Sequence, residues 1–126
     1  MKTNINEVEI NGIVYVPKGS EKSEVTNPEG LKLVMVRTYS AGVFFGYLAR
    51  RESTLAGIEV TLLNARRVYY WAGALTLSQL AMEGTCKPED CKFPTPVNSI
   101  DLIAIEIIPI TEVAEKSLNN VKIWKM

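Results

Sequence analysis

The side chains best suited to recognition chemistry are concentrated at Asn64–Trp71, with the sequence NARRVYYW. Here Arg66 and Arg67 stand beside three aromatic residues, among them Tyr70 and Trp71. A guanidinium fork chelates phosphate through paired hydrogen bonds, and an aromatic face stacks on a planar base. The pattern therefore predicts a site for a nucleotide-like ligand. It equally fits a strand whose aromatic rings fill the core while the arginines stack on them or pair with carboxylates.

Three residues upstream are candidates for secondary contacts to the same ligand, namely Arg37, Ser40 and Arg50. Ser40 lies in a small polar loop whose hydroxyl and N–H groups could cradle an anion, although most such loops are only turns. All five arginines fall between residues 31 and 67, where six cationic and two acidic side chains leave a net charge of +4. This segment predicts a local positive face, which suits a small anion better than a long polyanion.

The sequence offers little for catalysis. Histidine is absent, which removes the commonest general base and the commonest metal ligand. Cys86 and Cys91 lack the partners and spacing of a zinc site, so we expect two ordinary thiols and no metal. Glu106, within an apolar run, either faces outward or needs a buried partner such as an arginine. Because no nucleophile–base pair is evident, we predict a protein that is not an enzyme and holds no cofactor.

Composition limits the class of protein. The 126 residues suffice for one domain with a modest core, and 22% charged residues are ordinary for a globular protein. A formal net charge of zero argues against duplex nucleic acid as a partner. No apolar run reaches the roughly 20 residues that span a bilayer. Since the first residues also lack the apolar core of a signal peptide, we expect a cytoplasmic protein with reduced thiols.

The elements that must position these residues are mostly strands. Alternating or apolar runs predict strands over residues 31–38, 43–51, 58–64, 66–73 and 100–110, and a final strand or tail over residues 121–124. Gly46 marks a bulge or a close approach of backbones. An Asn-Ala turn is expected to separate the third strand from the fourth. Short connections between the first four strands predict an antiparallel meander.

Two short helices follow from the leucine spacing and the capping residues. The first covers residues 75–84, with Thr76 or Ser78 as the N-cap and Gly84 at the end. Thr111 caps a second helix that runs through about residue 118. Three prolines make residues 86–97 an extended loop.

The chain divides into three regions. Residues 1–17 include a turn-forming Asn-Gly pair and predict a β-hairpin arm, which either pairs with another subunit or adds an edge hairpin to the domain. Residues 18–30 are polar and rich in turn formers, as in a flexible linker. Residues 31–126 form the body. There we predict a mainly β fold, a small antiparallel barrel or sandwich of about five to seven strands with one or two short helices.

Motifs between Leu31 and Met126 resemble a widespread family of short phage and prophage proteins of unknown function. The resemblance rests on RTxSAGVxFG at 37–46, NARRxYYW at 64–71, GAxTLxQLAxEG at 73–84, KPxxCKF at 87–93 and EIIP at 106–109. It implies a phage-encoded protein and no established activity. A looser architectural analogy links the chain to phage "sponges", small oligomeric β-rich proteins that sequester cyclic nucleotides or cyclic ADP-ribose-like signals of bacterial defence systems.

Together these features lead to a working hypothesis of a cytoplasmic, homo-oligomeric anti-defence protein that sequesters a small phosphorylated ligand. Its expected ligand-binding residues are Arg66 and Arg67 for phosphate, Tyr70 and Trp71 for stacking, and Arg37, Ser40 and Arg50 as further contacts. The alternative is an adaptor that inhibits a host protein or a structural component without a small-molecule ligand, motivated by the apolar surplus at residues 100–110. Single-stranded nucleic-acid binding is a third hypothesis.

Overall fold

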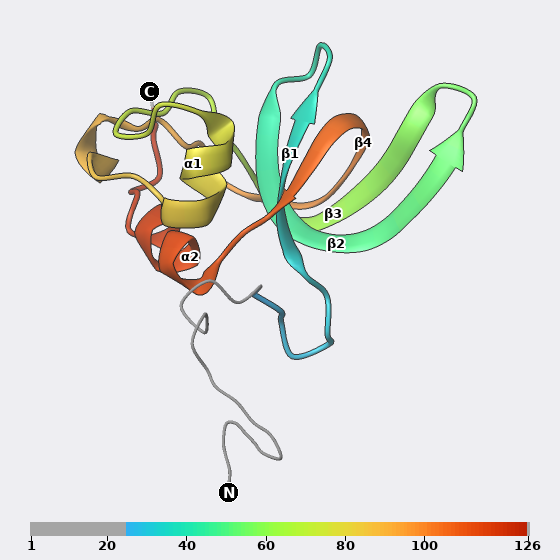
Figure 1. Ribbon diagram of the computed structural model, residues 1–126, viewed down its shortest axis with the longest axis horizontal. Coiled ribbons are helices and arrows are strands. Elements are labelled where there is room, and N and C mark those ends of the chain that lie inside the picture. Colours follow the sequence, from blue (N-terminus) through green and yellow to red (C-terminus); the bar gives the residue numbers. More distant parts are fainter. Residues whose placement is uncertain (1–24, 126) are drawn as a thin grey trace, which may run out of the picture.

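Four antiparallel strands close into a small barrel in the computed structural model, which describes residues 25–125 (Figure 1). They are β1 (Leu33–Thr38), β2 (Val43–Thr54), β3 (Gly57–Arg67) and β4 (Val97–Pro109). The first half of β4 pairs with β3 and its second half with β1, and Ala104 is the residue at which the partner changes. The mainly β, antiparallel barrel with two short helices is confirmed, with fewer strands than predicted.

The barrel has fewer strands than predicted because one strand, β3, replaces two predicted strands. Residues 58–64 and 66–73 do not form separate strands, since β3 runs without interruption from Gly57 to Arg67. Beyond it the chain leaves the barrel and makes only an isolated bridge between Tyr70 and Lys92. Residues 121–124 likewise contribute one bridge, from Ile123 to Phe93. The predicted hairpin arm, residues 1–17, lies outside the described residues.

Asn64 and Ala65 form a β-bulge within β3 rather than the predicted turn. Phe45 pairs with Arg66 and Tyr47 with Leu63, so two residues of β3 lie opposite Gly46 alone. Asn64 takes a left-handed conformation with φ of 52°, which asparagine tolerates better than most residues. The predicted role of Gly46 is confirmed, because a Cβ there would lie 3.0 Å from the Ala65 Cα. The bulge keeps β3 continuous while changing the direction of its side chains.

A second bulge, in β4, decides where Glu106 points. Arg37 pairs with Glu106 and Thr38 with Ala104, so Ile105 is left without a partner. Simple alternation would have put Glu106 on the same face as Ala104, whose side chain lies in the barrel interior. The extra residue turns the carboxylate to the outside, where Glu106 Oε1 accepts a hydrogen bond from Arg37 Nε at 2.8 Å. The expected arginine partner is present, at the surface rather than in the core.

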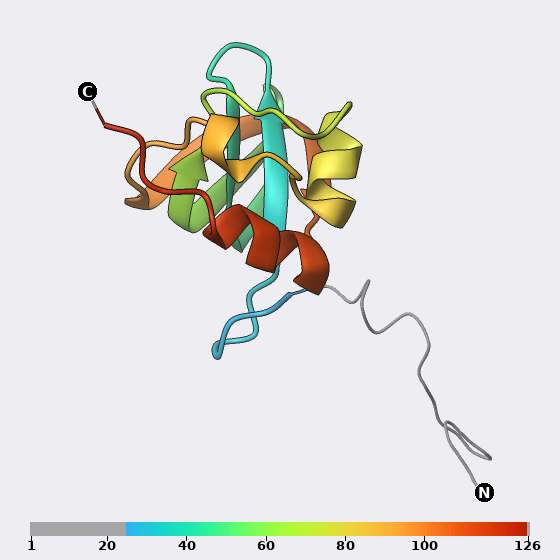
Figure 2. The same cartoon turned by 90° about the vertical axis from the view of Figure 1, so that its left-hand side faces the viewer.

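The helices begin and end where the capping signals predict. Helix α1 spans Leu77–Glu83, and the Thr76 hydroxyl accepts a hydrogen bond from the Gln79 N–H. Helix α2 spans Glu112–Asn119, and Thr111 caps it in the same way. Within the predicted loop, residues Pro88–Asp90 form one 3₁₀ turn, η2. Figure 2 shows α2 crossing in front of the barrel strands with α1 beside it.

Two apolar layers hold these elements together. The barrel interior is filled by residues from all four strands: Val34, Val36, Phe44, Val60, Leu62, Ala65, Leu102 and Ala104. A second layer lies between the outer barrel face and the helices, and includes Met35, Phe45, Leu80, Phe93, Ile110 and Leu118. The helices and the long loop before β4 thus cover one side of the barrel, and the β2–β3 hairpin extends from the other side (Figure 1).

The described part of the predicted linker is packed against the domain. Val25 is only 7% exposed and belongs to the layer under the helices. Its N–H donates to the carbonyl of Ile110, and its own carbonyl accepts from the N–H of Leu33. The Asn27 side chain accepts from the backbone N–H groups of Glu29 and Leu31, which fixes the turn that follows. Val25 and the turn after it are therefore joined to the domain by packing and hydrogen bonds.

A candidate ligand cleft between the barrel and helix α2

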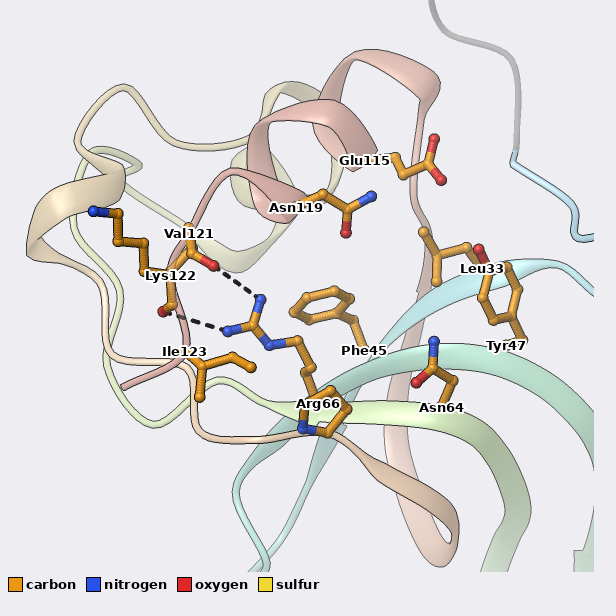
Figure 3. A pocket seen from close by; sticks show the side chains of 11 residues that line it. Leu33, Phe45, Tyr47, Asn64, Arg66, Glu115, Asn119, Val121, Lys122 and Ile123 are labelled. Atoms are coloured by element: carbon orange, nitrogen blue, oxygen red, sulfur yellow. Dashed lines mark hydrogen bonds between the residues drawn. The ribbon is translucent and has the colours of Figure 1, made fainter. Parts of the chain in front are cut away.

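A cleft of about 460 Å³ opens between the outer face of the barrel, α2 and the segment after it (Figure 3). Leu33, Phe45 and Tyr47 contribute from β1 and β2, and Pro96 also lines the cleft from just before β4. Residues 121–123 form the opposite wall. Its volume lies within the range of pockets that hold small organic ligands.

Arg66 lines one end of this cleft and is 8% exposed. Its Nη2 donates to the carbonyl of Phe93 at 2.9 Å. Its Nη1 donates to the carbonyl of Val121 at 3.1 Å (Figure 3). Longer contacts reach the carbonyls of Pro94, at 3.4 Å, and Lys122, at 3.5 Å. The guanidinium also lies 5.2 Å from the centre of the Phe93 ring. Arg66 therefore ties β3 to two segments that are distant in sequence.

The charge of Arg66 has no carboxylate partner within residues 25–125. Burial lowers the pKa of this guanidinium, because desolvation disfavours its charged form. Arginine nevertheless stays protonated in proteins, so the cation persists with only carbonyl dipoles around it. An anion in the cleft would face an uncompensated positive charge.

Two amide side chains face the cleft from opposite walls. Asn64 projects from the bulge of β3 and Asn119 from the last turn of α2, with the Phe45 ring between them (Figure 3). Neither amide group makes a hydrogen bond to any other residue of the described chain. Each amide offers two donors and one acceptor oxygen. The pair can therefore read the polar edge of a planar ligand.

The other end of the cleft is acidic. Glu115 on α2 and Tyr47 on β2 both line it. Partial burial raises the pKa of the Tyr47 phenol above its ordinary value of 10.0, and the nearby Glu115 carboxylate raises it further. The phenol thus remains a hydrogen-bond donor over the whole physiological pH range. One end of the cleft carries a cation and the other a carboxylate and a hydroxyl.

Arg67 lies with the loop between β1 and β2, outside the cleft. Its guanidinium stacks 4.3 Å from the centre of the Phe44 ring and donates to the carbonyl of Ala41. Ser40 is in the same loop and is exposed. The structure therefore brings Arg67 close to the predicted anion loop. The Arg66 side chain instead reaches the backbone of residues 93–94 and 121–122.

The remaining predicted residues have other partners. Arg50 contacts Glu52 at 2.6 Å and Glu59 at 3.0 Å on the β2–β3 hairpin, while Arg37 is paired with Glu106 as described above. Trp71 is half-buried, and its indole N–H donates to the carbonyl of Ala74. Tyr70 is 52% exposed beside Lys92. The seven predicted residues thus do not converge on one site.

A family model for a domain of unknown function, DUF6948, matches residues 31–118. The chain belongs to this family. The DUF6948 match includes most of the cleft, from Leu33 to Glu115. No curated protein and no solved structure matches the chain. Within residues 25–125 no helix is both long and apolar enough to cross a membrane.

The two thiols of this DUF6948 protein are free, as predicted. Cys86 is exposed, whereas Cys91 is buried. The Cys91 sulfur lies 3.6 Å from the carbonyl oxygens of Ala72 and Lys87 and accepts a contact from the Ala72 N–H at 3.5 Å. It therefore helps to fix the long loop. Residues 25–125 contain no group of three or more acidic or cysteine side chains that could share a metal ion.

Five polar residues of the DUF6948 cleft were not predicted as ligand contacts: Tyr47, Asn64, Glu115, Asn119 and Lys122. One signal was available, because Glu115 and Asn119 are four residues apart on a predicted helix and so share a face. Asn64 was noticed only as a turn former. Its side chain reaches the cleft because the bulge changes the direction of β3, and no local pattern indicates that change.

Proposed function

We propose that this DUF6948 protein is a phage-encoded, non-enzymatic binding protein that sequesters a small phosphorylated ligand of nucleotide type in the α2 cleft. The observation that carries the proposal is the combination of two unpartnered amides with the uncompensated cation of Arg66 around one cleft. Both asparagines are exposed, so water solvates their amides in the free protein, and a polar ligand edge would replace that water. Sequestration of a nucleotide signal in the cytoplasm would give the anti-defence role that the sequence suggested.

The proposed ligand would use the two ends of the cleft differently. A planar base fits between Asn64 and Asn119, where their amides bind its edge and Phe45 gives it apolar contact. A phosphate would lie toward Arg66, whose field favours an anion even though most of its N–H groups are occupied. Sugar hydroxyls would meet Glu115, a hydrogen-bond acceptor. In this arrangement the amides, rather than the arginine pair, provide most of the selectivity.

A thermal-shift screen against cyclic dinucleotides, cyclic trinucleotides and cyclic ADP-ribose isomers tests the proposal. A ligand at about 100 times its dissociation constant stabilises the native state by about 2.7 kcal/mol, or several degrees for a domain of this size. We expect a ligand that is recovered intact after heating, as a binding protein requires. Turnover of that ligand during incubation would instead indicate an enzyme.

Two substitutions locate the binding to the cleft. Asn119→Ala removes one amide, and Asn64→Gly removes the other while keeping the left-handed backbone. Both should reduce the thermal shift strongly, because each leaves polar ligand atoms without a partner. Asn98→Ala, at an exposed asparagine of β4 outside the cleft, is the matched control. If all three variants keep the full shift, the ligand binds elsewhere; a flat panel would remove the nucleotide proposal.

A second function, interaction with a protein, is favoured by apolar side chains at the surface. Ile103 and Ile105 are 38% and 51% exposed on β4, and Leu55 is fully exposed at the tip of the β2–β3 hairpin. The partner would be a host protein or a second copy of the chain, and the second case would give the homo-oligomer expected for a sponge. Light scattering of the wild type and Ile105→Lys tests the second case. A monomeric wild type would exclude self-association and direct the search to host proteins.

A further inference from the structure

Three aromatic rings and one lysine form an exposed cluster beside the tail of the domain. The Tyr69 ring stacks on the Trp124 ring, with centroids 5.1 Å apart and planes inclined by 10°. The Lys92 Nζ lies 5.5 Å from the centre of the Trp124 ring and 5.9 Å from that of Tyr70. We call Tyr69, Tyr70, Lys92 and Trp124 the aromatic platform. It is separate from the residues that line the α2 cleft.

Backbone hydrogen bonds fix this platform. The N–H groups of Tyr69 and Tyr70 both donate to the carbonyl of Lys92, at 3.1 and 3.2 Å, and the Lys92 N–H donates to the carbonyl of Tyr70 at 2.8 Å. The Trp124 N–H donates to the carbonyl of Phe93 at 2.9 Å, which holds the tail against the same segment. The rings are therefore presented at defined positions before any partner binds, which lowers the entropic cost of binding.

The rings remain open to solvent despite these contacts. Tyr69 is 63% exposed although one of its faces lies against Trp124, so its other face is available. Tyr70 is 52% exposed. Aromatic side chains dominate the apolar surface that proteins bury, but both tyrosines leave more than half of their surface in water. Planar groups that stack on them would bury the free faces.

Cationic groups lie around the rings. Lys92 belongs to the platform, and Lys122 lines an adjoining hollow of about 370 Å³ together with Trp124. Lys122 also lines the α2 cleft, and in Figure 3 its side chain extends toward η2. Glu89 also lines this hollow and is its acidic member. Exposed rings with ammonium groups beside them match the alternation of base and phosphate along a single strand.

We propose that the aromatic platform binds single-stranded nucleic acid, with bases stacked on Tyr69 and Tyr70 and phosphates contacted by Lys92 and Lys122. Stacking of this kind does not depend on sequence, because every base has a π face. The zero net charge of the chain limits the interaction to a short stretch of nucleotides and makes it weak in high salt. Duplex nucleic acid presents no free base faces to the platform and should not compete.

Fluorescence anisotropy with a labelled oligothymidine of about 12 nucleotides, at about 50 mM salt, tests this site. We expect binding that also quenches Trp124 fluorescence, and Tyr69→Ala or Tyr70→Ala should weaken it on the order of tenfold. Tyr69→Phe retains the ring and should bind as the wild type does. Tyr39→Ala, at a 91% exposed tyrosine outside the platform, is the matched control. Thermal midpoints show whether each variant is folded.

The other possible results of this experiment each decide whether the aromatic platform binds single-stranded nucleic acid. Absence of binding at low salt overturns the proposal. Binding that falls with Lys92→Gln but is unchanged in folded Tyr69→Ala and Tyr70→Ala would show electrostatic attraction without stacking, and also overturns it. A host protein that requires both tyrosines, with no oligonucleotide binding, would assign the platform to a protein partner instead. Asn119→Ala, which tests the α2 cleft, should leave oligonucleotide binding unchanged, so the two proposals fail independently.

Discussion

Removal of the Arg66 side chain should destabilise the whole domain. Arg66→Ala deletes two short charge-assisted hydrogen bonds, to the carbonyls of Phe93 and Val121. Bonds of this type contribute about 1.5–3 kcal/mol each, or about 3–6 kcal/mol together. The regained side-chain freedom offsets about 2 kcal/mol, and the cleft lets water reach the Val121 carbonyl. We therefore expect a loss of about 1–4 kcal/mol, which lowers the melting temperature by roughly 10 °C at the middle of that range.

Calorimetry or circular dichroism at neutral pH measures this loss, and the neighbouring arginine supplies the control. Arg67→Ala removes an exposed guanidinium that stacks on Phe44, which should cost below about 1 kcal/mol. Arg66→Lys keeps the charge but not the fork, so it should recover only a minor part of the loss. Similar melting temperatures for Arg66→Ala and Arg67→Ala would refute the assignment of Arg66 as a structural tie.

Two further predictions concern the barrel wall of the cleft. Gly46→Ala should lower the free energy of unfolding by about 1–3 kcal/mol in a denaturant titration, because its Cβ would crowd Ala65 and the Leu63 carbonyl at 3.0–3.2 Å; an unchanged midpoint would show that the bulge can relax. Tyr47 should lose its proton only above its ordinary pKa of 10.0, because burial and Glu115 raise that pKa. Between pH 10.0 and the higher pKa of the folded state, Tyr47 keeps its proton in the folded protein and loses it in the unfolded chain. The contribution of Tyr47 to stability is therefore complete below pH 10.0 and is lost as the pH rises through the folded pKa. Tyr47→Phe should remove the latest component of the ultraviolet tyrosinate titration, and removal of an earlier component would contradict the shift.

Local signals were sufficient for the element types and the helix ends. Thr76 and Thr111 each precede an apolar repeat, and both cap the helices that follow. The apolar runs in β1 and β4 likewise indicated strands, and the short connections from β1 to β3 gave the correct antiparallel class. These features depend on residues within a few positions of one another, which a single sequence displays directly.

The bulges and the cleft depend on contacts between distant segments. Asparagine is a residue type that favours turns. Asn64 nevertheless continues a strand, because Gly46 on the neighbouring strand leaves room for the extra residue. Glu106 faces outward because Ile105 is skipped in the pairing with β1. Arg66 is buried because the carbonyls that it contacts belong to residues 93–94 and 121–122. None of these partners can be identified from the neighbouring sequence.

The closure of the barrel has a consequence for the order in which the chain is made. β1 hydrogen-bonds to β4, whose residues follow it by roughly 70 positions, so the pairing of Val34 with Pro109 waits until the second half of β4 has been synthesised. During that interval a β1–β2–β3 sheet has two open edges, and open edges pair readily with other chains. Closure over so long a separation also slows folding. Chains that stop before Pro109 should therefore associate through these edges, and synthesis of the last residues of β4 ends this period of exposure.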